Sequence, residues 1–116
     1  MMTENNRKKE LQAQYKERAI VGGVYVVKNT PKNKLLLEAD TDLQGSKNRF
    51  EFAKKTGSCS YMKLNSDWTA QGSDDFVFEV LEELEKGETQ TLAEFKDDIG
   101  LLKEIWREKL SDQDFY

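Results

Sequence analysis

The chain of 116 residues contains no histidine, one cysteine and one proline. Without histidine, Ser–His and Cys–His catalytic pairs are excluded, and general acid–base chemistry would fall to Tyr, Glu, Asp or Lys. A zinc site is nearly excluded as well, because histidine and several cysteines are its usual ligands. Any metal would need oxygen ligands, which favours Mg²⁺ or Mn²⁺. The single thiol, Cys59, cannot form an internal disulfide.

The sequence also lacks a long apolar run. No segment approaches the roughly 18 to 20 apolar residues that a membrane span requires. Residues 1–20 carry positive charge but no apolar core of a secretory signal. We therefore expect a cytoplasmic protein that does not enter a membrane. The length, with 37% hydrophobic residues, suits one domain with one modest core.

Charge is distributed unevenly along the chain. Residues 1–73 hold 13 Lys and Arg against 8 Asp and Glu, a net charge of +5, whereas residues 74–116 hold 5 against 14, a net charge of −9. A basic front part is compatible with contacts to phosphate in nucleic acid. Lysines scattered over solvated faces would give the same count, so both interpretations stay open.

The first part of the sequence predicts a helix followed by a hairpin. The helix is expected within residues 1–20, where Leu11, Tyr15 and Ala19 repeat every four residues. Residues 21–28 are β-branched and aromatic, which is typical of a strand, and residues 34–39 predict the returning strand. The turn between the two strands contains the only proline.

The second part of the sequence predicts two short helices, a third strand and a long helix. Ser46 and Gly57 would bound one short helix, and a second is expected over residues 61–72. A strand follows at residues 76–81, with alternating apolar residues. The long helix begins with the capping box of Thr91 and Glu94. Its apolar arc consists of Phe95, Ile99, Leu102 and Trp106, widened by Leu101 and Ile105.

These elements define an α+β domain at residues 21–110, and residues 111–116 are expected to be a frayed tail. In element order and motifs the chain resembles the GIY-YIG nuclease family, as a divergent small bacterial member. Gly23, Val24 and Tyr25 match the family's Gly-Ile-Tyr motif, and "LLLEADTDL" takes the place of its second motif. The later stretch "SDWTAQGSDDFVFEVLEEL" is similar to the family's third-strand region.

The resemblance implies a three-stranded antiparallel sheet flanked by helices and the metal-dependent hydrolysis of phosphodiesters in nucleic acid. By this resemblance, Tyr25 would orient or deprotonate a water molecule, and Arg49 would contact phosphate. Lys47, Lys54 and Lys55 would add positive charge for phosphate binding. The alternatives are that Tyr25 only packs its ring in the sheet and that the basic residues form a solvated face.

The metal ligand has two candidates on the long helix. The family uses a glutamate on this helix, and Glu104 stands in a similar context, although it falls about 60° outside the apolar arc. Asp98 falls inside the arc, where a carboxylate must be paired, capped or metal-bound. In the second motif, Glu38 replaces a glycine and would either add a metal ligand or repel phosphate, and Leu36 replaces a tyrosine.

The sequence therefore supports three functional hypotheses. The first is a divergent GIY-YIG domain whose hydrolysis of nucleic acid, with one Mg²⁺ or Mn²⁺, is weakened or lost. The second is a non-catalytic module on the same scaffold that binds nucleic acid or a protein. In the third, the wide apolar arc of the long helix is a surface for oligomerisation or for a partner.

Overall fold

The structure is a computed structural model that describes residues 19–116. The N-terminal helix expected before Ala19 lies outside the described residues. None of the helices within residues 19–116 is long and apolar enough to cross a membrane.

A sheet of four strands forms the centre of the molecule, in the order β3-β1-β2-β4. The strands are β1 (Val21–Asn29), β2 (Lys34–Asp40), β3 (Phe76–Glu85) and β4 (Asp114–Phe115). The first three pair antiparallel, as predicted, and the short β4 pairs parallel to β2. The sheet is therefore mostly antiparallel, with one strand more than the sequence predicted.

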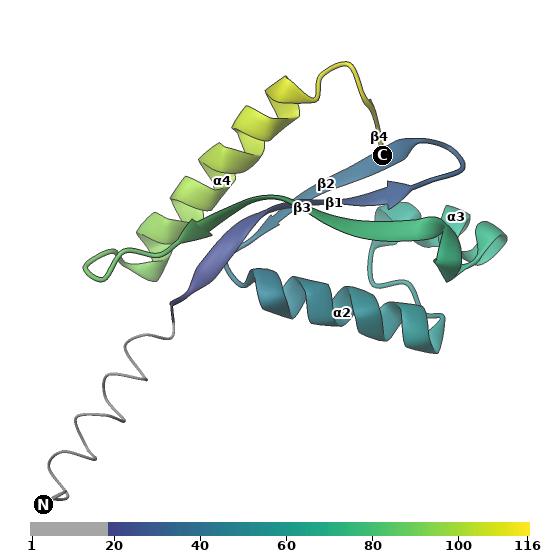
Figure 1. The fold of residues 1–116 in the computed structure, drawn as a ribbon, viewed down its shortest axis with the longest axis horizontal. Helices are drawn as coiled ribbons and strands as arrows, with labels where there is room; N and C mark the ends of the chain where they lie inside the picture. Colours follow the sequence, from purple (N-terminus) through teal and green to yellow (C-terminus); the bar gives the residue numbers. More distant parts are fainter. Residues whose placement is uncertain (1–18) are drawn as a thin grey trace, which may run out of the picture.

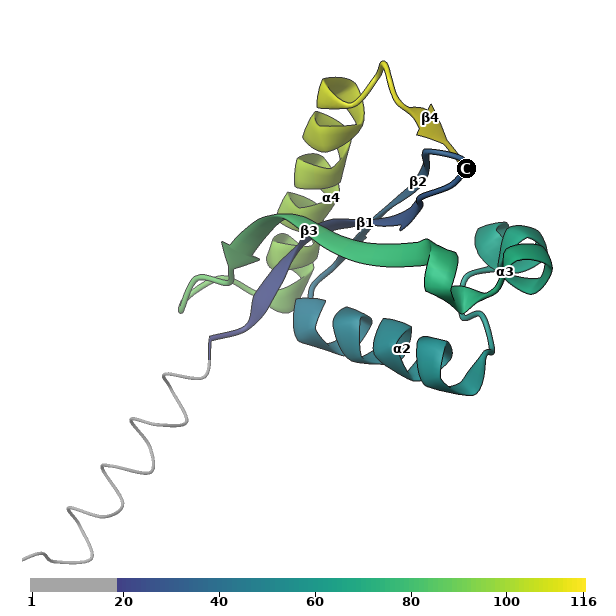
Figure 2. The same ribbon diagram turned by 45° about the vertical axis from the view of Figure 1, so that its right-hand side comes forward.

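Helices cover both faces of the sheet (Figures 1 and 2). The helices α2 (Leu43–Thr56) and α3 (Asn65–Gln71) lie on one side, and α4 (Leu92–Lys109) lies on the other. Because successive strand residues point to opposite faces, β1 supplies both cores. Tyr25 and Val27 belong to the cluster under α2, whereas Val24 and Val26 belong to the cluster under α4.

α2 begins earlier than predicted. Asp42, rather than Ser46, is its N-cap residue, and the Asp42 side chain accepts a hydrogen bond from the backbone N–H of Gly45 at 3.0 Å. Ser46 is instead fully buried and faces the sheet. The predicted end is confirmed, because Gly57 adopts the left-handed conformation with a φ of 75°. The capping box of Thr91 and Glu94 is confirmed as well.

The apolar arc of α4 is narrower in the structure than predicted. Phe95 and Ile99 are buried, but Leu101 and Ile105 are 64% and 49% exposed. The expectation that these two residues widen the packing is therefore wrong. The physical reason is that the sheet contacts only one stripe of the helix that lies on it.

β3 is longer than predicted and contains a bulge. Its pairing with β1 shifts between Val24, which lies opposite Glu82, and Tyr25, which lies opposite Val80. Leu81 is therefore the extra residue, and it packs on the α4 side with its neighbour Glu82, which accepts a hydrogen bond from the Trp106 indole at 2.9 Å.

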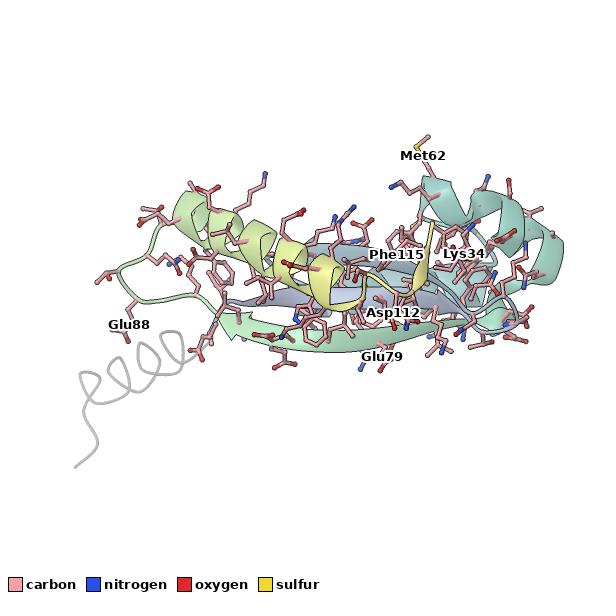
Figure 3. The ribbon with its side chains drawn as sticks, turned by 90° about the horizontal axis from the view of Figure 1, so that it is seen from above. Lys34, Met62, Glu79, Glu88, Asp112 and Phe115 are labelled. Atoms are coloured by element: carbon pink, nitrogen blue, oxygen red, sulfur yellow. The ribbon has the colours of Figure 1, made fainter. Side chains whose placement is uncertain are left out.

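The C-terminal tail is ordered, which corrects the expectation that residues 111–116 are frayed. β4 pairs with the start of β2, and Figure 3 shows Phe115 beside Lys34. The backbone N–H of Tyr116 donates to the carbonyl of Leu35 at 2.9 Å. The Tyr116 hydroxyl donates to Asp67 at 2.6 Å and accepts from the amide of the buried Asn29 at 2.8 Å. These polar contacts join the tail to β1 and α3.

Gly23 allows β1 and β3 to approach at the position where their pairing becomes irregular. A Cβ at Gly23 would overlap the backbone carbonyl oxygen of Glu82, which cannot move without disturbing the strand pair. Gly23→Ala should therefore lower the free energy of unfolding by about 2 kcal/mol or more, measured by urea denaturation. Gly87→Ala is the control, because its nearest atom would be the Gln90 Cβ at an ordinary 3.5 Å. Equal stability of the two variants would contradict this account of β1–β3 packing.

Candidate functional site

Tyr25 lies in the middle of the central strand with its side chain in the core under α2. The residue is only 4% exposed, and its ring stacks on that of Phe78 with a centroid separation of 4.4 Å. Its hydroxyl lies 3.1 Å from the hydroxyl of Tyr61, a residue in the loop after α2. Burial and the neighbouring Tyr25 raise the pKa of Tyr61 above its ordinary value. The two phenols therefore form a hydrogen-bonded pair, in which the raised pKa keeps Tyr61 protonated near neutral pH.

Sequence reasoning missed Tyr61. It lies 36 positions from Tyr25. Its spacing to Leu64 and Trp68 marked it only as an apolar residue of the helix predicted over residues 61–72. Glu38 is directly opposite Tyr25 in the β1–β2 pair and so lies on the same face. The charges of Arg49 and Glu38 act on the pKa of Tyr61 in opposite directions, so both charged groups are close to the phenol pair.

Arg49 is held by a carboxylate of the same protein. Its Nη2 atom donates to Asp40 Oδ2 at 2.7 Å and to Ser46 Oγ at 3.1 Å. Ser46 Oγ in turn donates to Asp40 Oδ2 at 2.7 Å, and the backbone N–H of Asp42 donates to Asp40 Oδ1 at 2.9 Å. The guanidinium expected to contact phosphate is therefore part of a polar cluster that joins the end of β2 to α2.

The three lysines predicted to bind phosphate are in different environments. Lys47 and Lys55 are exposed on α2, and neither has an ion-pair partner within residues 19–116. Lys54 is half-buried, because its ammonium donates to the carbonyl of Phe76 at 3.2 Å and lies 5.7 Å from the centroid of the Phe50 ring. Two of the three ammonium groups are thus accessible to a ligand.

The two carboxylates predicted to bind metal lie on α4, across the sheet from Tyr25 (Figure 1). Glu104 is exposed. Asp98 is exposed too, which corrects its expected place inside the apolar arc, and it accepts a hydrogen bond from the Gln90 side chain at 2.6 Å. In the described part of the chain, no group of three His, Cys, Asp or Glu side chains could hold a metal ion.

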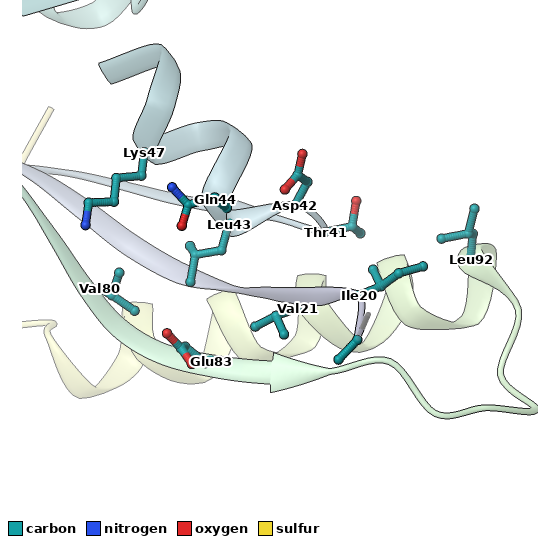
Figure 4. Close-up of a pocket in the computed structure, with 11 residues that line it drawn as sticks. Ile20, Val21, Thr41, Asp42, Leu43, Gln44, Lys47, Val80, Glu83 and Leu92 are labelled. Carbon is teal, nitrogen blue, oxygen red and sulfur yellow. The ribbon is translucent and has the colours of Figure 1, made fainter. Parts of the chain in front are cut away.

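A hollow of about 760 Å³ opens beside the N-terminal half of α2 (Figure 4). Apolar residues from the start of β1, from α2 and from β3 line it, among them Val21, Leu43 and Val80. Lys47 and Glu83 also line this hollow, and Thr41 does so from the turn that connects β2 to α2. The hollow lies on the same side of the sheet as Tyr25, in a region of mixed charge.

The fold is a small α+β domain with helices on both faces of a mostly antiparallel sheet. Comparison of the sequence with protein-family models found no match, and comparison with curated proteins found none either. Among solved structures, the catalytic domain of the homing endonuclease I-TevI matches with a TM-score of 0.56 and 24% identity, over 78% of this chain and 88% of that domain. A mutant of that domain matches with the same TM-score and 25% identity, covering 78% of this chain and 84% of that one.

I-TevI is a GIY-YIG homing endonuclease, and the domain described here is GIY-YIG-like in fold. The predicted resemblance and the predicted fold class are therefore confirmed. The sheet has four strands rather than three because of β4.

The Asp40 cluster makes stability depend on pH. Burial alone would raise the pKa of Asp40, but hydrogen bonds from Ser46, Asp42 and Arg49 outweigh burial and hold that pKa below its ordinary value of 3.8. The stabilisation is fully present above the unfolded-state pKa and is lost as the pH falls through the lower folded-state value. Asp40→Asn should therefore destabilise the protein clearly at about pH 7 and much less at about pH 2.5, measured by denaturant unfolding. Asp112→Asn is the control at an exposed carboxylate. An equal loss for Asp40→Asn at both pH values would contradict the assignment.

Proposed function

We propose that this GIY-YIG-like domain binds nucleic acid without hydrolysing it. The observation that carries the proposal is the separation of the groups that phosphodiester hydrolysis requires. The phenol of Tyr25 is buried in a pair with Tyr61 on one side of the sheet, and the candidate carboxylates lie on the other side. The intact fold and the accessible basic residues of α2 support retained binding.

Each component of the reaction is affected. Hydrolysis needs an activated water, a cation on the phosphoryl oxygens and stabilisation of developing charge. Tyr25 directs its hydroxyl to another phenol, and Arg49 is paired with Asp40 at 2.7 Å. A strongly bound phosphate would have to displace that carboxylate from Arg49, and Glu38 adds a second negative charge on the same face.

Two observations favour nucleic acid as the ligand. The matching structures are catalytic domains of an endonuclease, which is an enzyme that cleaves nucleic acid. α2 carries the exposed residues Lys47 and Lys55, which have no ion-pair partner within residues 19–116. Counterion release on phosphate contact would make such binding dependent on salt.

The catalytic part of the proposal predicts that the purified protein does not cleave plasmid DNA or single-stranded DNA with Mg²⁺ or Mn²⁺. The physical reason is that the candidate carboxylates Glu104 and Asp98 lie on α4, across the sheet from the Tyr25 hydroxyl. Gel electrophoresis of the incubated DNA is the measurement, with Tyr25→Phe as the matched variant that removes one oxygen atom. Cleavage by the native chain that disappears in Tyr25→Phe would show an active nuclease and reject this part.

The binding part predicts that Lys47→Glu combined with Lys55→Glu weakens binding to a fluorescent oligonucleotide, measured by anisotropy. The logarithm of the affinity should fall with the logarithm of the salt concentration by about 0.9 for each phosphate contact, and the double variant should reduce that slope. Lys86→Glu, in the loop between β3 and α4, is the control for a change of charge elsewhere. Binding that is absent or independent of salt would reject nucleic acid as the ligand.

A further inference from the structure

We infer that a hollow between the end of β2 and α4 binds a phosphodiester group of nucleic acid through Lys96 and Lys103. The inference rests on the proposed function and adds a second place of contact to it. The hollow measures about 480 Å³. Its walls are the segment 39–41 on one side and the α4 residues Lys96, Ile99, Gly100 and Lys103 on the other.

The four residues from α4 lie on one stripe of the helix, since they are three, four and seven positions apart. Ile99 is buried and anchors this stripe to the sheet, where its Cδ1 atom lies close to Gly22. The two lysines lie one turn on either side of this anchor. Their positions relative to β2 are therefore set by the packed core.

The positive charge of the hollow is not compensated by ion pairs. Neither Lys96 nor Lys103 has a carboxylate within ion-pair distance in the part of the chain that the structure describes. Asp40 also lines the hollow, but its oxygens accept hydrogen bonds from Arg49, Ser46 and the Asp42 backbone. Lysine binds phosphate as a compact point charge, and two such charges beside the Thr41 hydroxyl suit an oxyanion.

Gly100 leaves the helix backbone open toward the hollow. No atom lies within 4 Å of the place where a Cβ would be, and Gly100 does not have a positive φ, so neither packing nor backbone geometry requires glycine there. Glycine inside a helix is unfavourable relative to alanine. The missing side chain of Gly100 leaves space for a ligand to approach the helix between Lys96 and Lys103.

A strand of nucleic acid fits this site better than a free phosphate because a second, larger hollow adjoins it at the turn between β2 and α2. Thr41 lines both hollows, and Lys47 lines the larger (Figure 4). Lysines thus stand on both sides of the turn between β2 and α2, matching the repeated charges of a phosphate backbone. The carboxylates along this path are Asp40, Asp42, which caps α2, and Glu83.

The first experiment compares oligonucleotide binding by the full chain and by Lys96→Ala combined with Lys103→Ala. Loss of two phosphate contacts should lower the salt slope by about 1 to 2 and the affinity at low salt by roughly tenfold. Lys86→Ala combined with Lys109→Ala removes the same charge, from the loop between β3 and α4 and from the last residue of α4, and should have a much smaller effect. Native affinity and slope in the Lys96–Lys103 variant would overturn the inference while leaving the proposed function standing.

The second experiment tests the shape of the hollow without changing its charge. Gly100→Leu places a side chain in the space above the helix, and the absence of neighbours within 4 Å means that the variant should fold. Circular dichroism would verify folding, and oligonucleotide affinity should still fall several-fold, as expected for a blocked phosphate contact. Unchanged affinity in a folded Gly100→Leu would show that no ligand enters this hollow.

The third experiment separates the strand from the free anion. Inorganic phosphate is titrated while the backbone amide signals of Thr41 and Gly100 are followed by NMR. Shifts that require Lys96 and Lys103, together with oligonucleotide binding, support the inference. Shifts from phosphate without any oligonucleotide binding would overturn both the nucleic-acid part of the inference and the proposed function. Oligonucleotide binding that leaves the Thr41 and Gly100 signals unmoved would overturn the inference alone.

Discussion

The structure depends on the burial of β1 between two helical layers. Hydrogen bonds to β2 and β3 satisfy its backbone along nearly its whole length, and the alternation of its side chains gives each layer its own core. The same alternation determines on which side of the sheet each candidate catalytic group lies. Tyr25 must face α2 if Val24 and Val26 are to face α4, so a phenol on β1 and a carboxylate on the outer side of α4 are kept apart by the sheet.

Much of the fold could be predicted because local patterns and tertiary packing agree. The β-branched strands, the left-handed Gly57 and the capping box at Thr91 are local features that the structure retains. The rest required contacts between distant segments. Asp42 caps α2 because Ser46 is turned inward to Asp40, and β4 forms because Tyr116 reaches Asn29 and Asp67. A repeating pattern in the sequence cannot reveal contacts between residues of distant segments.

The candidate site could be predicted only in part, for the same reason. The strand position of Tyr25 follows from the alternation of its neighbours, but its partner Tyr61 comes from an irregular loop. The type of residue at Arg49 suggested phosphate, whereas the availability of its guanidinium depends on Asp40, on a different element. Asp98 shows a further limit, because helical periodicity gave a direction on α4 but not how much of the helix surface the sheet would cover.

The order of the strands also determines where the sheet stops growing. β4 shields the beginning of β2, whereas no strand in residues 19–116 pairs with the outer side of β3. Unpaired strand edges invite other chains to add to the sheet, a route to fibrils and insoluble assemblies. Along β3 the chain places Glu79, Glu82, Glu83 and Glu85. These glutamates would repel the same glutamates on the β3 edge of a second copy of the chain. This repulsion and the bulge at Leu81 both oppose self-association through the β3 edge.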